Sequence, residues 1–201
     1  MRSLEHRLLV CVLALLMAAG AAAAADLASA KRAYDRKDYA SAFKQLLPMA
    51  KQGNAKAEFM LARMYLMGQG VLKDRSEAMK LFNASAVQGN ADAQFFLGSL
   101  YLLPHVNIAE GLKWTRLSAE QGNQDAQLLL GKAYMDGNSG VPRDPVKADM
   151  WLRLAAKNNL PFYELQLAAA ERQMNAGQIA KGKALAAAWK PKHGLRPGNN
   201  P

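Results

Sequence analysis

The chain has 201 residues, a length that fits one domain with short additional segments. Hydrophobic residues make up 51% of it, and Ala, Leu, Met, Lys and Gln outnumber β-branched and aromatic residues, a mixture that favours helix. The formal net charge of +10 would attract acidic proteins, nucleic acids or anionic polymers, and the single cysteine excludes an intrachain disulfide.

Residues 1–25 have the pattern of an export leader. Arg2 and Arg7 precede an uncharged run that begins at Leu8 and ends in small residues up to Ala25. This pattern predicts a cleavable signal peptide, cleavage near Ala25 and a periplasmic or secreted protein. A membrane anchor formed by the uncleaved segment is the alternative, because the run approaches the roughly 20 residues that span a bilayer. Export argues against nucleic acid as a partner.

An internal repeat follows the leader. Glycine–asparagine pairs recur at 53–54, 89–90 and 122–123, and Asn158 and Asn159 stand at the fourth place, which gives spacings of 36, 33 and 37 residues. Other positions keep the same irregular spacing, namely Ala50, Ala86, Ala119 and Ala156, then Leu61, Leu97 and Leu130, then Tyr65, Tyr101 and Tyr134. Several columns with one shared spacing indicate copies of a single structural unit.

Each unit predicts two helices, because apolar residues recur every three or four positions. The first helix of each pair is expected at about 54–67, 91–103 and 124–136, and the second at about 75–88, 108–121 and 145–158. Flanking helices are expected at about 26–36, 39–51, 161–175 and 177–189. The sequence therefore predicts an all-α domain of four to five helix pairs over 26–189, followed by a disordered basic tail, rich in proline and glycine, at 190–201.

Three motifs carry more than periodicity. They are Gly-Asn-Ala-Asp-Ala-Gln-x-x-Leu-Gly-x-x-Tyr at 89–101, Gly-x-Gly-Val-x-x-Asp at 68–74 and Trp-Leu-Arg-Leu-Ala-Ala at 151–156. The chain from about 33 to 160 thereby resembles Sel-one-like repeats, relatives of the tetratricopeptide repeat (TPR). The resemblance implies a right-handed α–α superhelix, a solenoid of helix–turn–helix repeats, and an adaptor of the exported bacterial type. The glycine loop of the pattern is missing at 103–106.

The sequence offers no catalytic or metal-binding constellation that we recognise. His6, His105 and His193 stand apart, without a carboxylate or second histidine at ligand spacing. No serine, threonine or cysteine occupies a glycine-elbow setting. We therefore predict that the protein is not an enzyme and holds neither a metal nor a cofactor. A hydrolase, which some relatives suggest, is the least favoured reading.

The first helix of each repeat carries a second row of side chains, opposite the core positions Leu61, Leu97 and Leu130. In a superhelix the first helices line the concave side, so this row predicts a partner-binding groove, apolar with two basic points. Packing of Phe59, Phe95 and Leu128 against the next repeat is the alternative. The predicted partner-binding residues are Phe59, Arg63, Leu66, Phe95, Ser99, Leu102, Leu128, Lys132 and Met135.

Together these features predict a monomeric, non-catalytic adaptor or regulator in the cell envelope, which binds a protein partner, acidic in character, in that groove. The alternative is a binder of an anionic envelope polymer such as peptidoglycan or lipopolysaccharide, held by the basic surface and tail. A solvated basic surface that aids solubility explains the charge equally well. The sequence does not identify the partner.

Overall fold

A computed structural model describes residues 26–103, 107–137, 140–158 and 160–198. The leader at 1–25, with its expected cleavage site, lies outside the described residues. The chain divides into two compact units, Met1–Leu81 and Phe82–Pro201, and each is described by itself. The described residues form helices and connecting turns without a strand, so the predicted all-α repeat architecture is confirmed. None of the described helices combines the length and the apolar character that a membrane crossing requires.

The first unit consists of short helices that pack around one apolar core. Residues 26–35 are helical, and α2 (Tyr39–Lys51), α3 (Ala55–Met67) and the first half of α4 (Arg75–Val87) follow. Leu46, Leu61 and Met64 are buried together between these helices. This core accounts for the apolar positions that recur every three or four residues.

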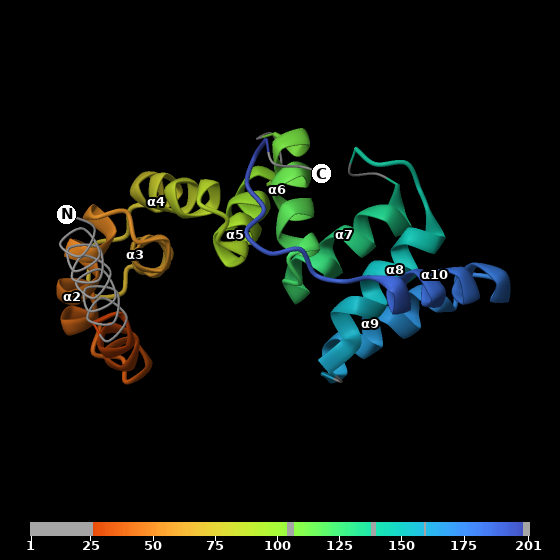
Figure 1. Ribbon diagram of the computed structural model, residues 1–201, viewed down its shortest axis with the longest axis horizontal. Helices are drawn as coiled ribbons and strands as arrows, with labels where there is room; N and C mark the ends of the chain where they lie inside the picture. The colour runs from red at the N-terminus through yellow and green to blue at the C-terminus, as the bar shows by residue number, and fades with distance from the viewer. Residues whose placement is uncertain (1–25, 104–106, 138–139, 159, 199–201) are drawn as a thin grey trace, which may run out of the picture. The chain divides into compact units, whose positions relative to one another are not determined.

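The second unit continues the repeats. Its helices are α5 (Ala91–Tyr101), α6 (Ile108–Glu120), α7 (Gln124–Asp136), α8 (Pro145–Ala155), α9 (Pro161–Glu171) and α10 (Ala176–Ala188), with a 3₁₀ turn at Ala156–Asn158. Each helix from α5 to α8 packs against the next in the chain, and α10 packs on α8 (Figure 1). Trp114 and Trp151 are buried, one in α6 and one in α8.

The recurring glycine–asparagine pair builds the turn between repeats. Gly89 has a φ of +93° and Gly122 one of +96°, in the left-handed region that glycine enters without steric cost. The next residue, Asn90 or Asn123, caps the following helix: its side chain accepts a hydrogen bond from the backbone N–H of Ala93 or Ala126. The glycine–asparagine pair therefore recurs in the sequence because each copy ends one helix and begins the next.

The turn between α8 and α9 lacks the glycine–asparagine cap. α8 ends at Ala155 and passes into the 3₁₀ turn, and α9 begins after Leu160 without a side-chain cap. Pro161 opens α9, as its fixed φ and missing N–H allow. The helix expected at 161–175 ends at Glu171, because Asn175 and Gln178 form a reciprocal capping box that starts α10.

The end of the chain differs from the disordered tail that its composition predicts. Residues 189–198, here called the C-terminal segment, leave α10 and run back along α6 to α5 (Figure 1). Leu195 in this segment is only 7% exposed. Backbone hydrogen bonds and the burial of that leucine hold a proline- and glycine-rich stretch in one path. Residues 199–201 lie outside the described part.

Candidate functional site

In the first unit, the predicted partner-binding residues lie on the face of α3 away from the buried Leu61. Phe59, Arg63 and Leu66 are all half-buried. The guanidinium carbon of Arg63 lies 5.8 Å from the centre of the Phe59 ring and 5.5 Å from that of Tyr34. Such stacking holds the cation over aromatic faces, so Arg63 is a positioned side chain more than a free point of charge.

In the second unit, the predicted row divides between surface and core. Phe95 and Leu128 are half-buried. Phe95 packs against a buried cluster that lies mainly in the next repeat, whereas the cluster beside Leu128 lies mainly in the repeat of Leu128 itself. Leu102 is half-buried against Leu112 of α6. The contacts of Phe95 are the packing against the next repeat that the alternative anticipated, although neither Phe95 nor Leu128 is sealed from solvent.

Met135 is a correction to the predicted site. It is only 7% exposed and packs with Ala148 and Leu152 of α8, so it belongs to the core. Its place near the end of α7 brings it under the following helix, which the helical period alone did not reveal. Ser99 is half-buried and Lys132 is exposed, as a surface row requires.

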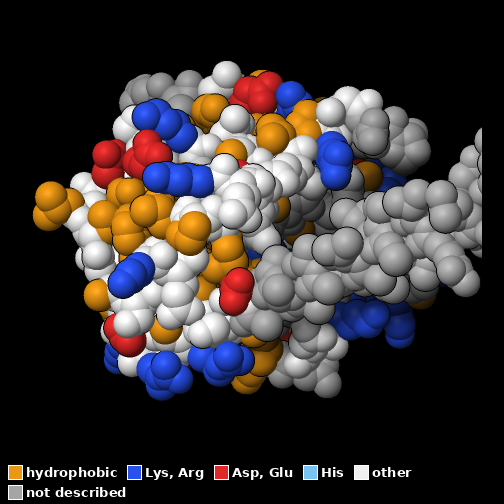
Figure 2. Space-filling model, turned by 60° about the vertical axis from the view of Figure 1, so that its left-hand side comes forward, with side chains coloured by type: hydrophobic (Ala, Val, Ile, Leu, Met, Phe, Trp, Pro, Cys, Tyr) orange, Lys and Arg blue, Asp and Glu red, His pale blue; other side chains and the backbone are white. Residues whose placement is uncertain are grey.

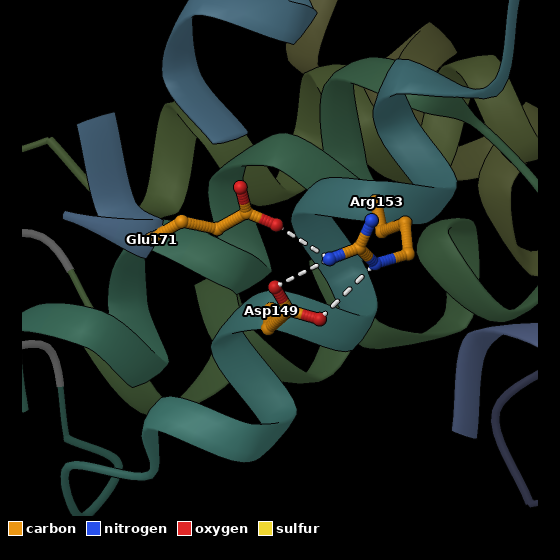
Figure 3. Close-up of polar contacts among 3 residues, drawn as sticks. All are labelled: Asp149, Arg153 and Glu171. Carbon is orange, nitrogen blue, oxygen red and sulfur yellow. Dashed lines mark hydrogen bonds and ion pairs between the residues drawn. The ribbon is translucent and has the colours of Figure 1, made fainter. Parts of the chain in front are cut away.

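A charged cluster fastens the C-terminal helices to one another. Arg153 of α8 donates hydrogen bonds to both carboxylate oxygens of Asp149, at 3.0 and 3.1 Å, and pairs with Glu171 of α9 (Figure 3). The Asp149 side chain is fully buried. Burial raises the pKa of Asp149, the hydrogen bonds and charge of Arg153 oppose that rise, and the nearby Glu171 adds to it. The ion pair between Arg153 and Glu171 therefore links α8 to α9 and has a structural role.

A hollow of about 620 Å³ lies beside this cluster. Its lining combines apolar and charged side chains, among them Leu154, Leu167, Trp189, Arg153, Lys157, Lys183 and Glu164. Basic side chains beside apolar ones can hold an anionic molecule with a hydrophobic part. Elsewhere Lys and Arg side chains are mixed with hydrophobic and acidic ones, as on the face in Figure 2.

Sequence reasoning missed a pair of glutamines that hold the C-terminal segment. Gln94 is fully buried at the start of α5, and its amide group donates to the carbonyl oxygens of Ala86 and Leu195. Its amide oxygen accepts a hydrogen bond from Gln121. The signal available in the sequence was the equivalent Gln127, because a glutamine repeated at a core position must have hydrogen-bond partners there.

The repeats match a known family model. The model of the Sel1 repeat matches residues 55–90, 91–123 and 124–160, which together exceed half of the chain. This chain belongs to the Sel1 repeat family. The boundaries of the matches coincide with the glycine–asparagine turns, so sequence and structure divide the Sel1 repeats at the same places. Sel1 repeat proteins generally mediate protein–protein interaction.

A solved structure of a Sel1 repeat protein supports the same fold. A Sel1 repeat protein from Oxalobacter formigenes is 27% identical, with a TM-score of 0.66 over 75% of this chain and 62% of that one. The present chain thus spans less than two thirds of that protein's length. The protective antigen c5321 of uropathogenic Escherichia coli, which has an SLR fold, is 26% identical with a TM-score of 0.46, over 80% of this chain and 46% of that one. No curated protein matches the chain.

The Sel1 fold is a scaffold that is typically non-catalytic. Among the described residues, no group of three or more His, Cys, Asp or Glu side chains is placed to hold a metal ion. The arrangement offers surfaces between helices, which suit the binding of another macromolecule.

Proposed function

We propose that this Sel1 repeat protein is an adaptor or regulator of the cell envelope that binds a protein partner on the exposed faces of α5 and α7. The observation that carries the proposal is the half-buried row on α5 and α7, with Phe95 and Leu128 in part accessible and Lys132 exposed. Apolar side chains beside a charge are typical of interfaces that exchange water for a partner. Export of the chain by its leader would deliver the protein to the envelope.

The charge of the surface favours an acidic partner. Lys132 is exposed on α7, and the formal net charge of the chain is +10. Opposite charges speed association and lose this effect as salt screens them. We therefore expect capture of the partner to weaken with ionic strength.

The test is cross-linking in intact envelopes followed by identification of the captured protein. Lys132→Glu and Phe95→Ala should each reduce capture by about tenfold, the effect of roughly 1.4 kcal/mol at an interface. Lys44→Glu is the matched control, because Lys44 is an exposed lysine of α2 outside the row. If Lys132→Glu and Phe95→Ala capture as much as the control does, the exposed faces of α5 and α7 are not the binding surface.

The basic hollow beside α10 supports a second candidate, the binding of an anionic envelope polymer. Lys157, Lys183 and Trp189 are among the residues that line it. The double variant Lys157→Gln and Lys183→Gln should reduce co-sedimentation with peptidoglycan or with lipopolysaccharide vesicles, because each lysine contributes attraction to the polymer. The exposed pair Lys44→Gln and Lys56→Gln serves as control. Equal sedimentation of both double variants would dismiss the hollow.

A further inference from the structure

The C-terminal segment is bound as a peptide ligand would be. Two backbone N–H groups of this segment donate to the turn that ends α6: Lys192 to the Glu120 carbonyl oxygen at 2.9 Å and Gly194 to the Gln121 side-chain oxygen at 2.8 Å. The Leu195 carbonyl oxygen accepts from Gln94 at 2.7 Å. Main-chain hydrogen bonds of this kind recognise the path of a backbone whatever its side chains are.

Gln94 and Gln121 act together on two adjacent residues of the segment, Gly194 and Leu195. The Gln121 amide group donates to the Gln94 amide oxygen at 2.7 Å, which orients both side chains. Gln121 thereby presents an acceptor to the N–H of Gly194, and Gln94 presents a donor to the carbonyl of Leu195. Since Gln94 is fully buried, its donor would lose a hydrogen bond whenever this place lacks a peptide or water.

Side chains of the segment add selectivity to these backbone contacts. Leu195 is buried, whereas the ammonium group of Lys192 lies 3.3 Å from the Glu120 carboxylate. A Cβ on Gly89 would lie 3.2 Å from the backbone of Gly194, so the turn glycine leaves room for a close backbone approach. The φ of Gly194 is +67°, in the left-handed region that favours glycine. The place therefore suits a stretch with a basic residue, a glycine at the bend and a leucine.

The equivalent glutamine of the next repeat provides an internal comparison. Gln127 donates to the Ala119 carbonyl oxygen at 3.1 Å, as Gln94 does to Ala86. Gln94 makes the additional bond to the C-terminal segment. The contact within the repeat recurs in both of these repeats, whereas the contact with Leu195 is made by Gln94.

We propose that Gln94, Gln121 and Glu120 form a binding site for a polypeptide segment that bends at a glycine, and that residues 192–195 occupy it in cis until a partner segment with the same basic, glycine and leucine pattern displaces them. This inference rests on the proposed adaptor function and names its peptide-binding site. A tethered segment competes at an effective concentration in the millimolar range, so only a partner with a matching segment at higher local concentration or with further contacts would displace it.

The test uses the protein purified from cells that express the full chain, together with a fluorescent peptide of residues 190–201. Leu195→Asp in the chain should free the site, and this variant should bind the wild-type peptide at least about tenfold more tightly than the wild-type chain does, because the tether no longer competes. A peptide that itself carries Leu195→Asp should bind at least about tenfold more weakly to the same variant.

A second substitution in the Leu195→Asp chain distinguishes a loss of peptide contacts from a general loss of structure. Gln94→Ala and Gln121→Ala should each weaken peptide binding at least about fivefold, whereas Gln127→Ala, which loses the same contact within the repeat, should leave it within about twofold. Absence of peptide binding to the Leu195→Asp chain, or equal effects of Gln94→Ala and Gln127→Ala, overturns the inference. A wild-type chain that is dimeric through exchanged segments overturns it too, because the occupant is then a second copy. Loss of the peptide site alone would leave envelope cross-linking through the α5 and α7 faces intact, so the two proposals fail separately.

Discussion

At the scale of the residue, the fold depends on polar side chains at helix ends. An asparagine after a left-handed glycine ends one repeat and starts the next, at Asn54, Asn90 and Asn123 alike. A cap of this type satisfies backbone N–H groups that a helix start leaves without partners. Short helices of 11 to 13 residues contain few internal turns, so their ends contribute a large share of their stability.

Removal of one cap tests this reasoning. The Asn54 side-chain oxygen accepts hydrogen bonds from the N–H groups of Lys56 and Ala57, both at 3.1 Å. Asn54→Ala should lower the free energy of unfolding by about 1 kcal/mol, measured by urea denaturation. Asn83→Ala, at an exposed position inside α4, should change it by less than about 0.5 kcal/mol. Equal effects of the two substitutions would contradict the capping role.

The buried carboxylate of Asp149 makes a prediction about pH. Arg153→Met removes the hydrogen bonds and the charge that oppose the raised pKa of Asp149, so this pKa should rise further. A carboxyl with a raised pKa in the folded state favours folding below its unfolded pKa and loses that contribution as pH rises through the folded value. The free energy of unfolding of the variant should therefore be only slightly below that of the wild type near pH 4 and clearly below it near pH 7.

Urea denaturation at several pH values measures the difference. At neutral pH the loss should be about 2 kcal/mol, below the 3–5 kcal/mol of a fully buried pair, because the Arg153 side chain is 26% exposed. Arg172→Met, at an exposed arginine just after α9, is the control and should track the wild type at each pH. A loss for Arg153→Met that does not change with pH would show that Asp149 stays ionised in the variant.

At the scale of the element, helices approach closely where one of them carries glycine. A Cβ on Gly131 of α7 would overlap Leu152 of α8, and a Cβ on Gly182 of α10 would lie 2.6 Å from the Cβ of Asp149. These glycines stand inside helices, where they cost roughly 1 kcal/mol relative to alanine. The close contacts between helices offset that cost.

Gly182→Ala tests the contact between α8 and α10. Overlap with Asp149 should destabilise the C-terminal helices by about 1–3 kcal/mol despite the better helix propensity of alanine. Trp189 lies 6.2 Å from Trp151, ring centre to ring centre, so its fluorescence should report the movement of α10. Gly177→Ala in the same helix meets only Asn175, at 3.3 Å, and should be neutral or stabilising by up to about 1 kcal/mol. A neutral Gly182→Ala would mean that α10 sits more loosely on α8.

The sequence predicted most elements closely, because apolar periodicity, caps and turns agree with one another. α2, α3 and α7 begin or end within one residue of the predicted bounds. Met135 was assigned to the surface because a helical period gives the direction of a side chain but not which neighbouring helix lies over it. The glutamine site escaped prediction because its partner, Leu195, is 101 positions away from Gln94, beyond the reach of any local pattern.

At the scale of the whole molecule, stability in repeat proteins is a sum of local terms. Each helix pair contacts mainly its neighbours, so damage to one repeat is expected to remain near it. Leu46 is fully buried in the first unit, and Leu46→Ala should remove about 2–5 kcal/mol of local stability.

Amide hydrogen exchange resolves where this loss falls. The Leu46→Ala variant should lose protection in α2 and α3 and keep it in α7 and α8, because core disruption in a solenoid is not shared by distant repeats. Leu130→Ala in α7 should give the reverse pattern, since Leu130 is buried in the cluster that joins α7 to α8. A uniform loss of protection in both variants would show that the chain unfolds as one cooperative block.

The hydrogen bond between Gln94 and Leu195 has a consequence for the order of folding. It joins residues 101 positions apart, whereas the bond from Ser118 to Ala91 spans 27. Loop closure entropy grows only with the logarithm of loop length, so the longer closure costs about 1 kcal/mol more. Refolding should therefore begin with rapid, low-contact-order pairing of adjacent helices, and clasping of α5 by the chain terminus should follow as a separate, slower kinetic phase.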